Sequence, residues 1–556
     1  MKSTLSNLLI QAADAHPDRP AVWSPTGELT YRDLRDRSMR LASALVEHGI
    51  EPGDRVVIAL PKDVTLPIAI FGTLLAGGAY VPIDYLTPPA RAHVIAADAE
   101  PVAVIGSSRS MRGMVLGDAS PADDGPGDNS PALHWLGPGW LDDEKFAERQ
   151  PVGVSLSALA QLGQSRSPVE VPASALAYIL YTSGSTGRPK GVAHTNASAL
   201  AFVRWAADAV RLSETDVVSQ HASASFDLSV FDFFCTAMAA ARLALVPAST
   251  FGRVATLCRF IVSTGVTVWY SVPSALLRAS AAESLAVLKG SALRQVIFAG
   301  EEIPAGPLRV LWQNLPSSCR VANWYGPTET NVCTFHDLTA LDVDGGGPIP
   351  IGKPCPYAAM SLAAGSLAAG PGAVRSNGTA GELLVASDTL MSGYWKLSAA
   401  TSRVCSTGPD GRAYYATGDL VSRDDARGFT FLGRVDRLLK VRGHRVQPEE
   451  VEHVLEQRAE IDEAAVVKHR RGEVEVLAAV VRVADGEALE HDAVIGHCSR
   501  FLPPYMVPDL ILPVTELPRG SRGKADYKAV LELLESQRDE AAGSRPKLAR
   551  SSELAQ

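Results

Sequence analysis

Cysteine is scarce in this sequence, and its spacing predicts neither a disulfide framework nor a metal site. The 556 residues include seven cysteines, an odd number, and no two of them form a CxxC pair. They are Cys235, Cys258, Cys319, Cys333, Cys355, Cys405 and Cys498. We therefore expect isolated, buried thiols and a reducing compartment, the cytoplasm.

An excess of positive charge is absent as well. The chain has 52 Lys and Arg against 61 Asp and Glu, which gives a formal net charge of −9 at pH 7. This balance argues against a nucleic acid or an anionic membrane surface as the main partner. With 46% hydrophobic and 20% charged residues, the chain has ample material for a globular core.

No N-terminal segment has the apolar core and small-residue cleavage site of a signal peptide. One apolar stretch, from Thr65 to Ile83, resembles a membrane span in composition. It is interrupted by Pro67, Pro82 and the pair Gly77–Gly78. The stretch therefore predicts a buried helix that runs into a buried strand.

Short apolar runs alternate with helical patterns along most of the chain. "DRVVIAL", "EPVAVIG", "GVTVWYSVP" and "LRQVIFAGEE" are typical of strands, and a helical period ends at Gly49. This alternation predicts an α/β fold with parallel sheets. The segment from Met111 to Pro168 is rich in Pro, Gly, Ser and Asp, which predicts an irregular surface insertion.

The composition changes after about Gly433, where a charged segment leads into a compact region of roughly 100 residues. We expect a large N-terminal domain of parallel and mixed sheets with helices over residues 1–434. A small α+β C-terminal domain is expected over residues 435–535, and a disordered, polar tail over 536–556.

The stretch "YTSGSTGRPKG" begins at Tyr181, directly after an apolar run with strand character. A helical pattern follows it, capped by Thr195 or Asn196. A loop of this kind between strand and helix offers free N–H groups and hydroxyls to phosphate oxygens, and Lys190 adds a positive charge. Pro189 stands where a Walker A loop requires glycine, which argues against an ordinary P-loop. From spacing alone, a flexible surface linker is an equal alternative.

Five motifs in order resemble those of the adenylate-forming superfamily, which includes acyl-CoA synthetases, amino-acid-adenylating domains of nonribosomal peptide synthetases and firefly luciferase. The loop is followed by "NWYGPTETNVC", "YATGDL", "GRVDRLLKVRGHRVQPEEVE" and "LPRGSRGKADYKAV". The resemblance runs from about Leu8 to about Leu533. It implies that the small C-terminal domain is mobile and turns at a hinge, here Asp436.

The resemblance also implies ATP and Mg²⁺ as cofactors. Glu329 resembles the magnesium ligand, a hard oxygen donor, and Lys524 the catalytic lysine that stabilises charge on the α-phosphate. Asp419 resembles the ligand of both ribose hydroxyls. In isolation, its TGD tripeptide and the GPTE segment are typical of ordinary turns. The other expected ATP contacts are Thr182, Ser183, Gly184, Ser185, Thr186, Gly187, Lys190, Gly300, Asn323, Tyr325, Gly326, Thr328 and Arg434.

The expected substrate follows from Asp227, which resembles the aspartate that pairs with the α-ammonium of amino acids. Ligases for fatty or aryl acids generally lack it, since an unpaired buried carboxylate is costly. The aligned side-chain pocket consists of Leu228, Phe231, Tyr270, Ile297, Ala299, Trp324, Val332 and Cys333. This uncharged pocket favours a small apolar ring or a short aliphatic chain and resembles that of prolyl-adenylating enzymes, except that Trp324 stands where a smaller residue is usual.

We therefore expect activation of an amino acid, with L-proline favoured, and its transfer to the phosphopantetheine thiol of a peptidyl carrier protein in secondary-metabolite biosynthesis. His221 resembles the aromatic gate between carboxylate pocket and thiol tunnel, and a structural histidine is the alternative. No segment resembles a carrier domain, so we expect a stand-alone enzyme. Another small apolar amino acid, an acid–CoA ligase and a non-catalytic relative are the alternatives. Gln447 and the pair Arg522–Gly523 depart from the family pattern.

Overall fold

The computed structural model describes residues 4–107, 114, 132–135, 153–155, 167–184, 187–247, 250, 253–280, 283–363, 380–471, 474–484, 489–519 and 525–543. Lys524 lies outside these residues, and so do Ser185 and Thr186 of the glycine-rich loop. The pair Arg522–Gly523, the end of the predicted tail and most of the predicted insertion also lie outside them.

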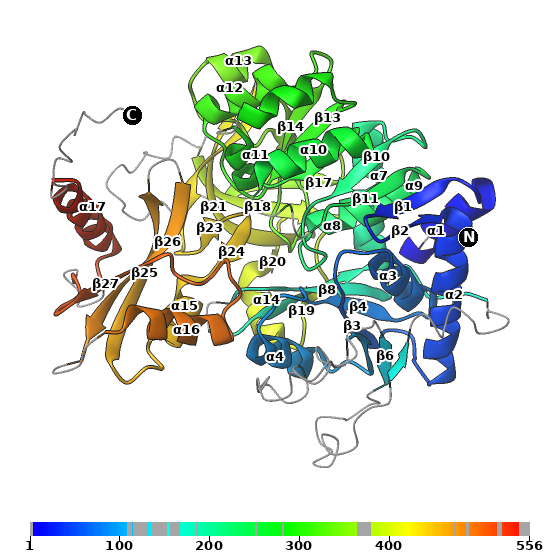
Figure 1. Ribbon diagram of the computed structural model, residues 1–556, viewed down its shortest axis with the longest axis horizontal. Coiled ribbons are helices and arrows are strands. Elements are labelled where there is room, and N and C mark those ends of the chain that lie inside the picture. The colour runs from blue at the N-terminus through cyan, green and yellow to red at the C-terminus, as the bar shows by residue number, and fades with distance from the viewer. Residues whose placement is uncertain are drawn as a thin grey trace, which may run out of the picture.

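Two large mixed sheets contain many of the described strands (Figure 1). The first has nine described strands in the order β16-β15-β14-β13-β12-β10-β11-β1-β2. They are β1 (Pro20–Ser24), β2 (Gly27–Thr30), β10 (Val217–Gln220), β11 (Arg242–Leu245), β12 (Val268–Ser271), β13 (Gln295–Ala299), β14 (Arg320–Tyr325), β15 (Thr334–Asp337) and β16 (Lys353–Pro354). The strands from β1 to β14 in this order pair in parallel, so the carboxyl ends of β10, β12, β13 and β14 meet at one edge.

The second sheet has eight described strands in the order β19-β9-β8-β4-β3-β5-β6-β7. They are β3 (Arg55–Ala59), β4 (Ala79–Pro82), β5 (Ala103–Gly106), β6 (Ala132–Trp135), β7 (Gly153–Ser155), β8 (Leu176–Thr182), β9 (Lys190–Thr195) and β19 (Gly393–Tyr394). The prediction of an irregular insertion is wrong for β6 and β7, which continue this sheet as antiparallel strands. Strand β6 pairs with β5 and β7 pairs with β6, interactions that the composition of the segment does not reveal.

The third sheet and the small domain follow. The third sheet contains β17 (Ala358–Ala363), β18 (Ala380–Ser387), β20 (Cys405–Thr407), β21 (Ala413–Asp424) and β22 (Gly428–Arg434). The small domain contains the hairpin of β23 (Leu439–Val441) and β24 (His444–Val446), and a sheet of β25 (Ile461–Arg471), β26 (Val474–Val483) and β27 (Leu510–Val514). The exact domain boundary and the hinge at Asp436 stay predictions.

Helices fill the space between the two large sheets and cover their outer faces. The described helices are α1 (Leu5–Ala15), α2 (Tyr31–Glu47), α3 (Thr65–Leu75), α4 (Pro89–Ala99), α7 (Asn196–Val210), α8 (Leu228–Val230), the π-helix η3 (Phe231–Cys235), α9 (Thr236–Met238), α10 (Val254–Thr264), α11 (Pro273–Ser280), the 3₁₀ segment η5 (Glu283–Gly290), α12 (Ala305–Asn314), α13 (Ala340–Asp344), α14 (Ser398–Val404), α15 (Pro448–Leu455), α16 (His491–Phe501) and α17 (Tyr527–Gly543). The largest core cluster joins both large sheets through α1, α2, α3 and α7.

Several elements confirm the sequence predictions. Helix α2 begins at a capping box of Thr30 and Asp33, and its leucines are buried on one face. The apolar stretch from Thr65 folds as the buried helix α3 followed by the buried strand β4. No described helix has both the length and the apolar character needed to cross a membrane. The seven cysteines are free thiols, and six of them are buried.

Two expectations change. The glycine-rich loop does not lead directly into a helix, because β9 pairs with β8 as an antiparallel hairpin before α7 begins at its N-cap Thr195. The hydrogen-bond donors that this loop can offer to a phosphate are therefore its own backbone N–H groups and hydroxyls, and no helix N-terminus adds to them. Helix α17 continues to Gly543, so the beginning of the predicted disordered tail is helical. Ala, Glu and Gln in this segment are good helix formers.

Candidate active site

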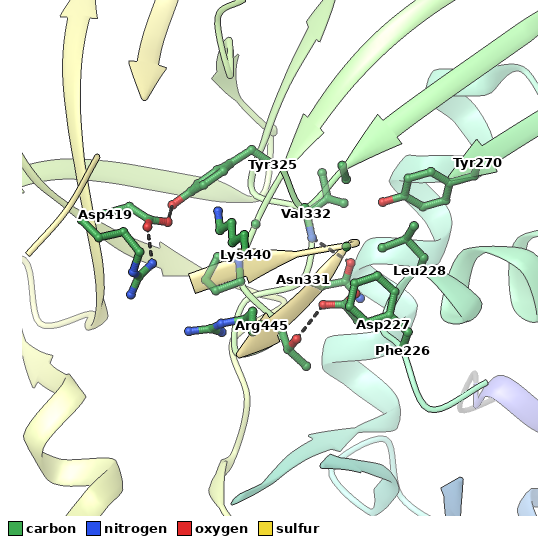
Figure 2. Close-up of a pocket in the computed structure, with 17 residues that line it drawn as sticks. Phe226, Asp227, Leu228, Tyr270, Tyr325, Asn331, Val332, Asp419, Lys440 and Arg445 are labelled. Carbon is green, nitrogen blue, oxygen red and sulfur yellow. Dashed lines mark hydrogen bonds and ion pairs between the residues drawn. The ribbon is translucent and has the colours of Figure 1, made fainter. Parts of the chain in front are cut away.

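A pocket opens at the shared carboxyl edge of the parallel strands, where ligands bind in open α/β sheets. Tyr270 lies in β12, and Gly300 and Gly326 directly follow β13 and β14. The hairpin β23–β24 of the small domain faces them from the opposite side (Figure 2). The pocket encloses about 40 Å³. Its walls are Phe226, Asp227, Leu228, Tyr270, Ala299, Gly300, Tyr325, Gly326, Pro327, Thr328, Asn331, Val332, Asp419, Arg434, Lys440, Gly443 and Arg445.

Asp227 supplies a carboxylate to the apolar end of this pocket. Thr328 Oγ1 donates a hydrogen bond of 2.7 Å to Asp227 Oδ2, shown in Figure 2. Burial raises the pKa of Asp227 to about 6, although the Thr328 hydrogen bond and the charge of Arg445 act in the opposite direction. Leu228, Tyr270, Ala299 and Val332 line the same pocket, as the sequence predicted for the substrate side chain. This end can therefore hold a cationic group beside a small apolar one.

The other four predicted substrate residues lie behind this wall. Phe231, Ile297, Trp324 and Cys333 are buried and are not among the lining residues. The Trp324 ring lies 5.4 Å from the ring of Tyr270 and 5.7 Å from that of Phe231, both edge-on. Trp205 packs against it from the far side at 4.9 Å. The Trp324 side chain therefore supports the pocket wall from behind Tyr270 without lining the pocket.

Glu329 is a buried carboxylate with two strong partners. Tyr394 Oη donates to Glu329 Oε1 at 2.7 Å, and Arg445 Nη1 lies 2.6 Å from Glu329 Oε2. Burial acts to raise the pKa of Glu329, but the charge of Arg445 and the Tyr394 hydrogen bond outweigh it and lower the pKa to about 2. Glu329 is therefore an ionised carboxylate whose charge is balanced by the Arg445 guanidinium.

Asp419 is held by neighbouring side chains as well. Tyr325 Oη donates to Asp419 Oδ2 at 2.5 Å, and Arg434 forms an ion pair with Asp419 Oδ1. Arg434 also contacts the expected hinge residue, with Nε 2.6 Å from Asp436 Oδ1. Asn323 lies apart from the pocket walls, where its amide donates to the Pro350 carbonyl at 2.8 Å.

The glycine-rich loop contacts the small domain. Ser183 Oγ donates to the Arg445 carbonyl at 2.6 Å and accepts from the Gln447 amide at 3.1 Å. Glycine is required at 184, because a Cβ there would collide with the Arg188 carbonyl. Lys190 lies over the Tyr394 ring at 4.8 Å, and burial lowers the pKa of its ammonium.

Thr182 and Gly187, two of the expected ATP contacts in the loop, lie at different sites from each other in this structure. Thr182, at the end of β8, lines a second cavity together with Ser183. Gly187 has a φ of 74° and lies beside the His453 ring of α15. The loop and the small domain therefore meet directly in this arrangement.

The small domain supplies three lining residues that the sequence analysis missed: Lys440, Gly443 and Arg445. Lys440 Nζ lies 5.6 Å from the Tyr325 ring, and burial lowers its pKa. Gly443 has a φ of 84°, and a Cβ at this position would collide with Val272. The hinge motif contains all three, but only its position in space reveals their role.

The described residues that directly follow position 524 lie away from the pocket. Ala525 packs against the core cluster of Leu517, Val530 and Leu534 on β25–β27 and α17. In Figure 1, α17 lies on the side of the small domain away from the large domain. In this domain arrangement the hairpin β23–β24, and not the beginning of α17, faces the pocket.

The second cavity, of about 420 Å³, joins the first at Phe226, Asp227, Thr328, Gly443 and Arg445, which line both. It runs between the two domains. On the small-domain side, the His444 ring stacks on the Tyr505 ring with centroids 3.6 Å apart. An ion pair between buried Arg91 of α4 and Glu450 of α15 closes the interface nearby.

His221 lies in the wall of this larger cavity, directly after β10. Its Nδ1 is 2.8 Å from Ser271 Oγ, and only 7% of the residue is exposed. The ring therefore borders the cavity and is fixed by a neighbouring strand. Both interpretations from the sequence, a gate and a structural histidine, agree with this position.

Two buried carboxylates, Glu329 and Asp419, lie at this site, and Glu329 is the one that the sequence predicts as a ligand of a divalent cation. No group of three or more His, Cys, Asp or Glu that could hold a metal occurs in the described part of the chain. Mg²⁺ commonly takes only one or two carboxylates and completes its shell with water and substrate phosphates. Ionised Glu329, already paired with a cation, fits such a ligand.

The match to known families agrees with this geometry. The chain matches the family described as AMP-binding enzyme over residues 9–395 and the family described as AMP-binding enzyme C-terminal domain over residues 450–524. The chain therefore belongs to the AMP-binding enzyme family.

Two relatives share the name L-proline–L-prolyl-carrier protein ligase. The one from Streptomyces coelicolor is 34% identical over 522 residues, which cover 92% of this chain and 93% of that protein. The one from Pseudomonas fluorescens is 33% identical over 535 residues, which cover 96% and 99%. The solved structure of the Vibrio cholerae adenylation domain AlmE, in complex with glycyl-adenosine-5'-phosphate, has the same fold with a TM-score of 0.74. It is 23% identical and covers 96% of this chain and 98% of that one.

Proposed function

We propose that the protein activates an amino acid, with L-proline favoured, as aminoacyl-AMP and transfers it to the phosphopantetheine thiol of a peptidyl carrier protein. The observation that carries this proposal is the carboxylate of Asp227 beside the apolar side chains of Leu228, Tyr270, Ala299 and Val332 in one pocket. An α-ammonium is the group that would pair with it, and the apolar walls leave room for a compact side chain. The names of the two relatives support proline and a carrier protein.

ATP would bind at the other end of the same pocket. Asp419 and Arg434 would hold the ribose, and Tyr325 would lie against the adenine with Gly300 and Gly326. The glycine-rich loop, with Thr182 to Gly187 and Lys190, would cradle the phosphates. Glu329 and Thr328 would hold the Mg²⁺–phosphate group, and Mg²⁺ neutralises charge on the phosphates when bound.

Adenylation needs a different position of the small domain. The substrate carboxylate attacks the α-phosphorus, the bond to the bridging oxygen breaks, and pyrophosphate leaves. Lys524 would enter the pocket and stabilise charge on the α-phosphate. Arg445 would withdraw from Glu329 together with its hairpin, because Arg445 and Mg²⁺ would compete for the same carboxylate. A rotation at Asp436 accounts for both movements, because a few residues can absorb a large domain motion.

Acyl transfer would use the arrangement seen in this structure. The cavity of about 420 Å³ meets the small pocket at Asp227 and leads away between the domains. A phosphopantetheine arm could enter through it, with His221 at the boundary. A low-dielectric, closed site would protect the reactive aminoacyl-AMP from water. The free thiols and the lack of a positive surface excess support a cytoplasmic enzyme.

The test is ATP–pyrophosphate exchange with each of the twenty amino acids. We expect L-proline to give the strongest signal, followed by loading of a prolyl carrier protein monitored by mass spectrometry. Exchange with another small apolar amino acid and not with proline would overturn the assignment of proline as the substrate. The proposed reaction class would remain in place. Product formation with coenzyme A alone, without exchange for any amino acid, would establish the acid–CoA ligase alternative.

A further inference from the structure

The loop of residues 221–227 forms a wall shared by the two cavities. His221 lies at its beginning and borders the larger cavity, and Asp227 lies at its end and borders both. Phe226 also lines both cavities. The loop belongs to the nine-stranded sheet, since it follows β10. Its position therefore sets the passage from one cavity to the other.

Two residues of the other large sheet hold this loop from behind. Lys62 follows β3, and its Nζ donates a hydrogen bond of 2.5 Å to the carbonyl of His221. Asp84 follows β4, and its Oδ2 accepts a hydrogen bond of 2.6 Å from Ser223 Oγ. The beginning of the loop is thus fastened across the gap between the two sheets.

Buried Asp232 acts electrostatically on the Lys62 ammonium. Asp232 belongs to the π-helix η3, is fully buried, and has no hydrogen-bond partner for either carboxylate oxygen in the described part of the chain. Burial raises its pKa well above the usual range, and the charge of Lys62 acts against this rise. Burial lowers the pKa of Lys62 to about 8, against the charges of Asp84 and Asp232.

The other end of the loop has its own attachment. Asp227 accepts a hydrogen bond from Thr328, and α8 begins directly after it at Leu228. Lys62 contacts the backbone at His221, six positions away along the loop. Loss of the Lys62 contact therefore loosens the backbone at the His221 end, which keeps its contacts to Ser271 and Asp84, and leaves the Asp227 end in place.

We propose that Lys62 is a positioning residue for acyl transfer: it fixes the His221 end of loop 221–227 so that the thiol can reach the aminoacyl-AMP. This inference rests on the proposed function. In that step the thiol sulfur bonds to the acyl carbon and the bond from this carbon to the phosphate oxygen breaks. AMP leaves with the electron pair, and the thiol proton passes to water. Adenylation, which depends on Asp227, does not require the Lys62 contact.

The experiment compares K62M, K62R and D232N with wild type, and K289M with its exposed lysine in η5 serves as the matched control. ATP–pyrophosphate exchange measures adenylation. A rapid-quench assay with preformed aminoacyl-AMP and pantetheine measures transfer. For K62M, we expect transfer to slow by about 10- to 100-fold, because a displacement of about 1 Å can cost that much, with exchange within about twofold of wild type. K62R should retain most of the transfer rate, D232N should lose part of it, and K289M should match wild type.

Each other result overturns the inference. Equal losses of exchange and transfer in K62M would show a merely structural role, and unchanged transfer would show no role. If K62M does not fold, D232N decides by the same difference between exchange and transfer, since Asn keeps the side-chain size of Asp. Crystal structures of the variants give a readout that does not depend on activity, namely displacement of residues 221–225 with residue 227 unmoved. Failure of wild type to activate any amino acid would instead overturn the proposed function.

Discussion

Arg445 of the small domain and Glu329 of the large domain form a buried ion pair, with Nη1 2.6 Å from Oε2. The guanidinium thus neutralises the carboxylate that we propose as the Mg²⁺ ligand. One negative site can bind the metal or the arginine, but not both. The pair therefore couples the chemistry at Glu329 to the position of the small domain.

Replacing Glu329 by Gln should reduce this coupling and lower the stability of the fold, more at neutral than at acid pH. The folded-state pKa of about 2 lies below the ordinary value of 4.5. A carboxyl group with a lowered pKa stabilises the fold fully above pH 4.5, and this stabilisation is lost as the pH falls towards 2. The loss is at most about 1.4 kcal/mol per pH unit. The difference in free energy of unfolding between wild type and E329Q should shrink from pH 6 to pH 3 in urea titrations. A constant difference would contradict the assigned ionisation.

The same variant tests the proposed metal ligand. We expect E329Q to slow ATP–pyrophosphate exchange by about 10²-fold, the typical loss when one charge-stabilising contact is removed, and to require more Mg²⁺ for half-maximal rate. E329D serves as the control that keeps the charge. Unchanged Mg²⁺ dependence in E329Q would exclude Glu329 as the ligand.

Asp227 should make amino-acid binding depend on pH. Its pKa is raised to about 6, so the carboxyl group is increasingly protonated below pH 6 and loses its attraction for an α-ammonium. The KM for the amino acid should therefore rise as pH falls from 7.5 to 5, measured by exchange. D227N should have a high KM that is nearly flat over this range. A parallel rise in both proteins would assign the pH effect to another group.

Trp324 should limit the size of the substrate side chain. Its ring packs against Tyr270 from behind the pocket wall, so W324L should let Tyr270 move back and open space for a longer apolar chain. We expect kcat/KM for proline to fall and that for leucine or phenylalanine to rise in exchange assays. Thermal unfolding is the necessary control, because shortening a buried Trp commonly costs a few kcal/mol. A uniform loss for all amino acids would indicate damage to the fold rather than altered specificity.

Gly443 should be required for the domain arrangement seen in this structure. An alanine Cβ would collide with Val272, and the positive φ of 84° is unfavourable for alanine. G443A should therefore hinder seating of the hairpin and slow loading of the carrier protein, with adenylation retained. Stopped-flow measurement of aminoacyl-AMP consumption by carrier protein would report the change. Equal rates in G443A and wild type would exclude a role for hairpin seating.

Lys524 should show the opposite pattern. Under the proposed function it acts in adenylation only, so K524M should lower exchange by about 10²- to 10³-fold. Transfer from preformed aminoacyl-AMP to the thiol should remain close to the wild-type rate. K528M, four residues further along in α17, is the matched control because Lys528 is exposed. Loss of both partial reactions in K524M would contradict a role limited to adenylation.

Local patterns in the sequence determined much of this fold. The apolar runs of β3, β5, β12 and β13 and the capped amphipathic helix α2 were predictable, because period, burial and capping are local properties. The ordered motifs also identified the family. Resemblance to that family assigned Asp227 to the amino acid and Thr328 to the phosphate. Spacing alone did not decide whether the glycine-rich loop is a phosphate site or a flexible linker.

Tertiary structure decided what depends on long-range pairing. The strands β6, β7 and β9 form only because neighbouring strands offer free edges, and the rings around Trp324 become a wall only by packing. The position of the hairpin β23–β24 brings Arg445 to Glu329 across 116 positions of sequence. The contact from Lys62 to the His221 carbonyl joins two different sheets. Charges separated this far in the chain act on one another only after folding brings them together in a medium of low polarizability.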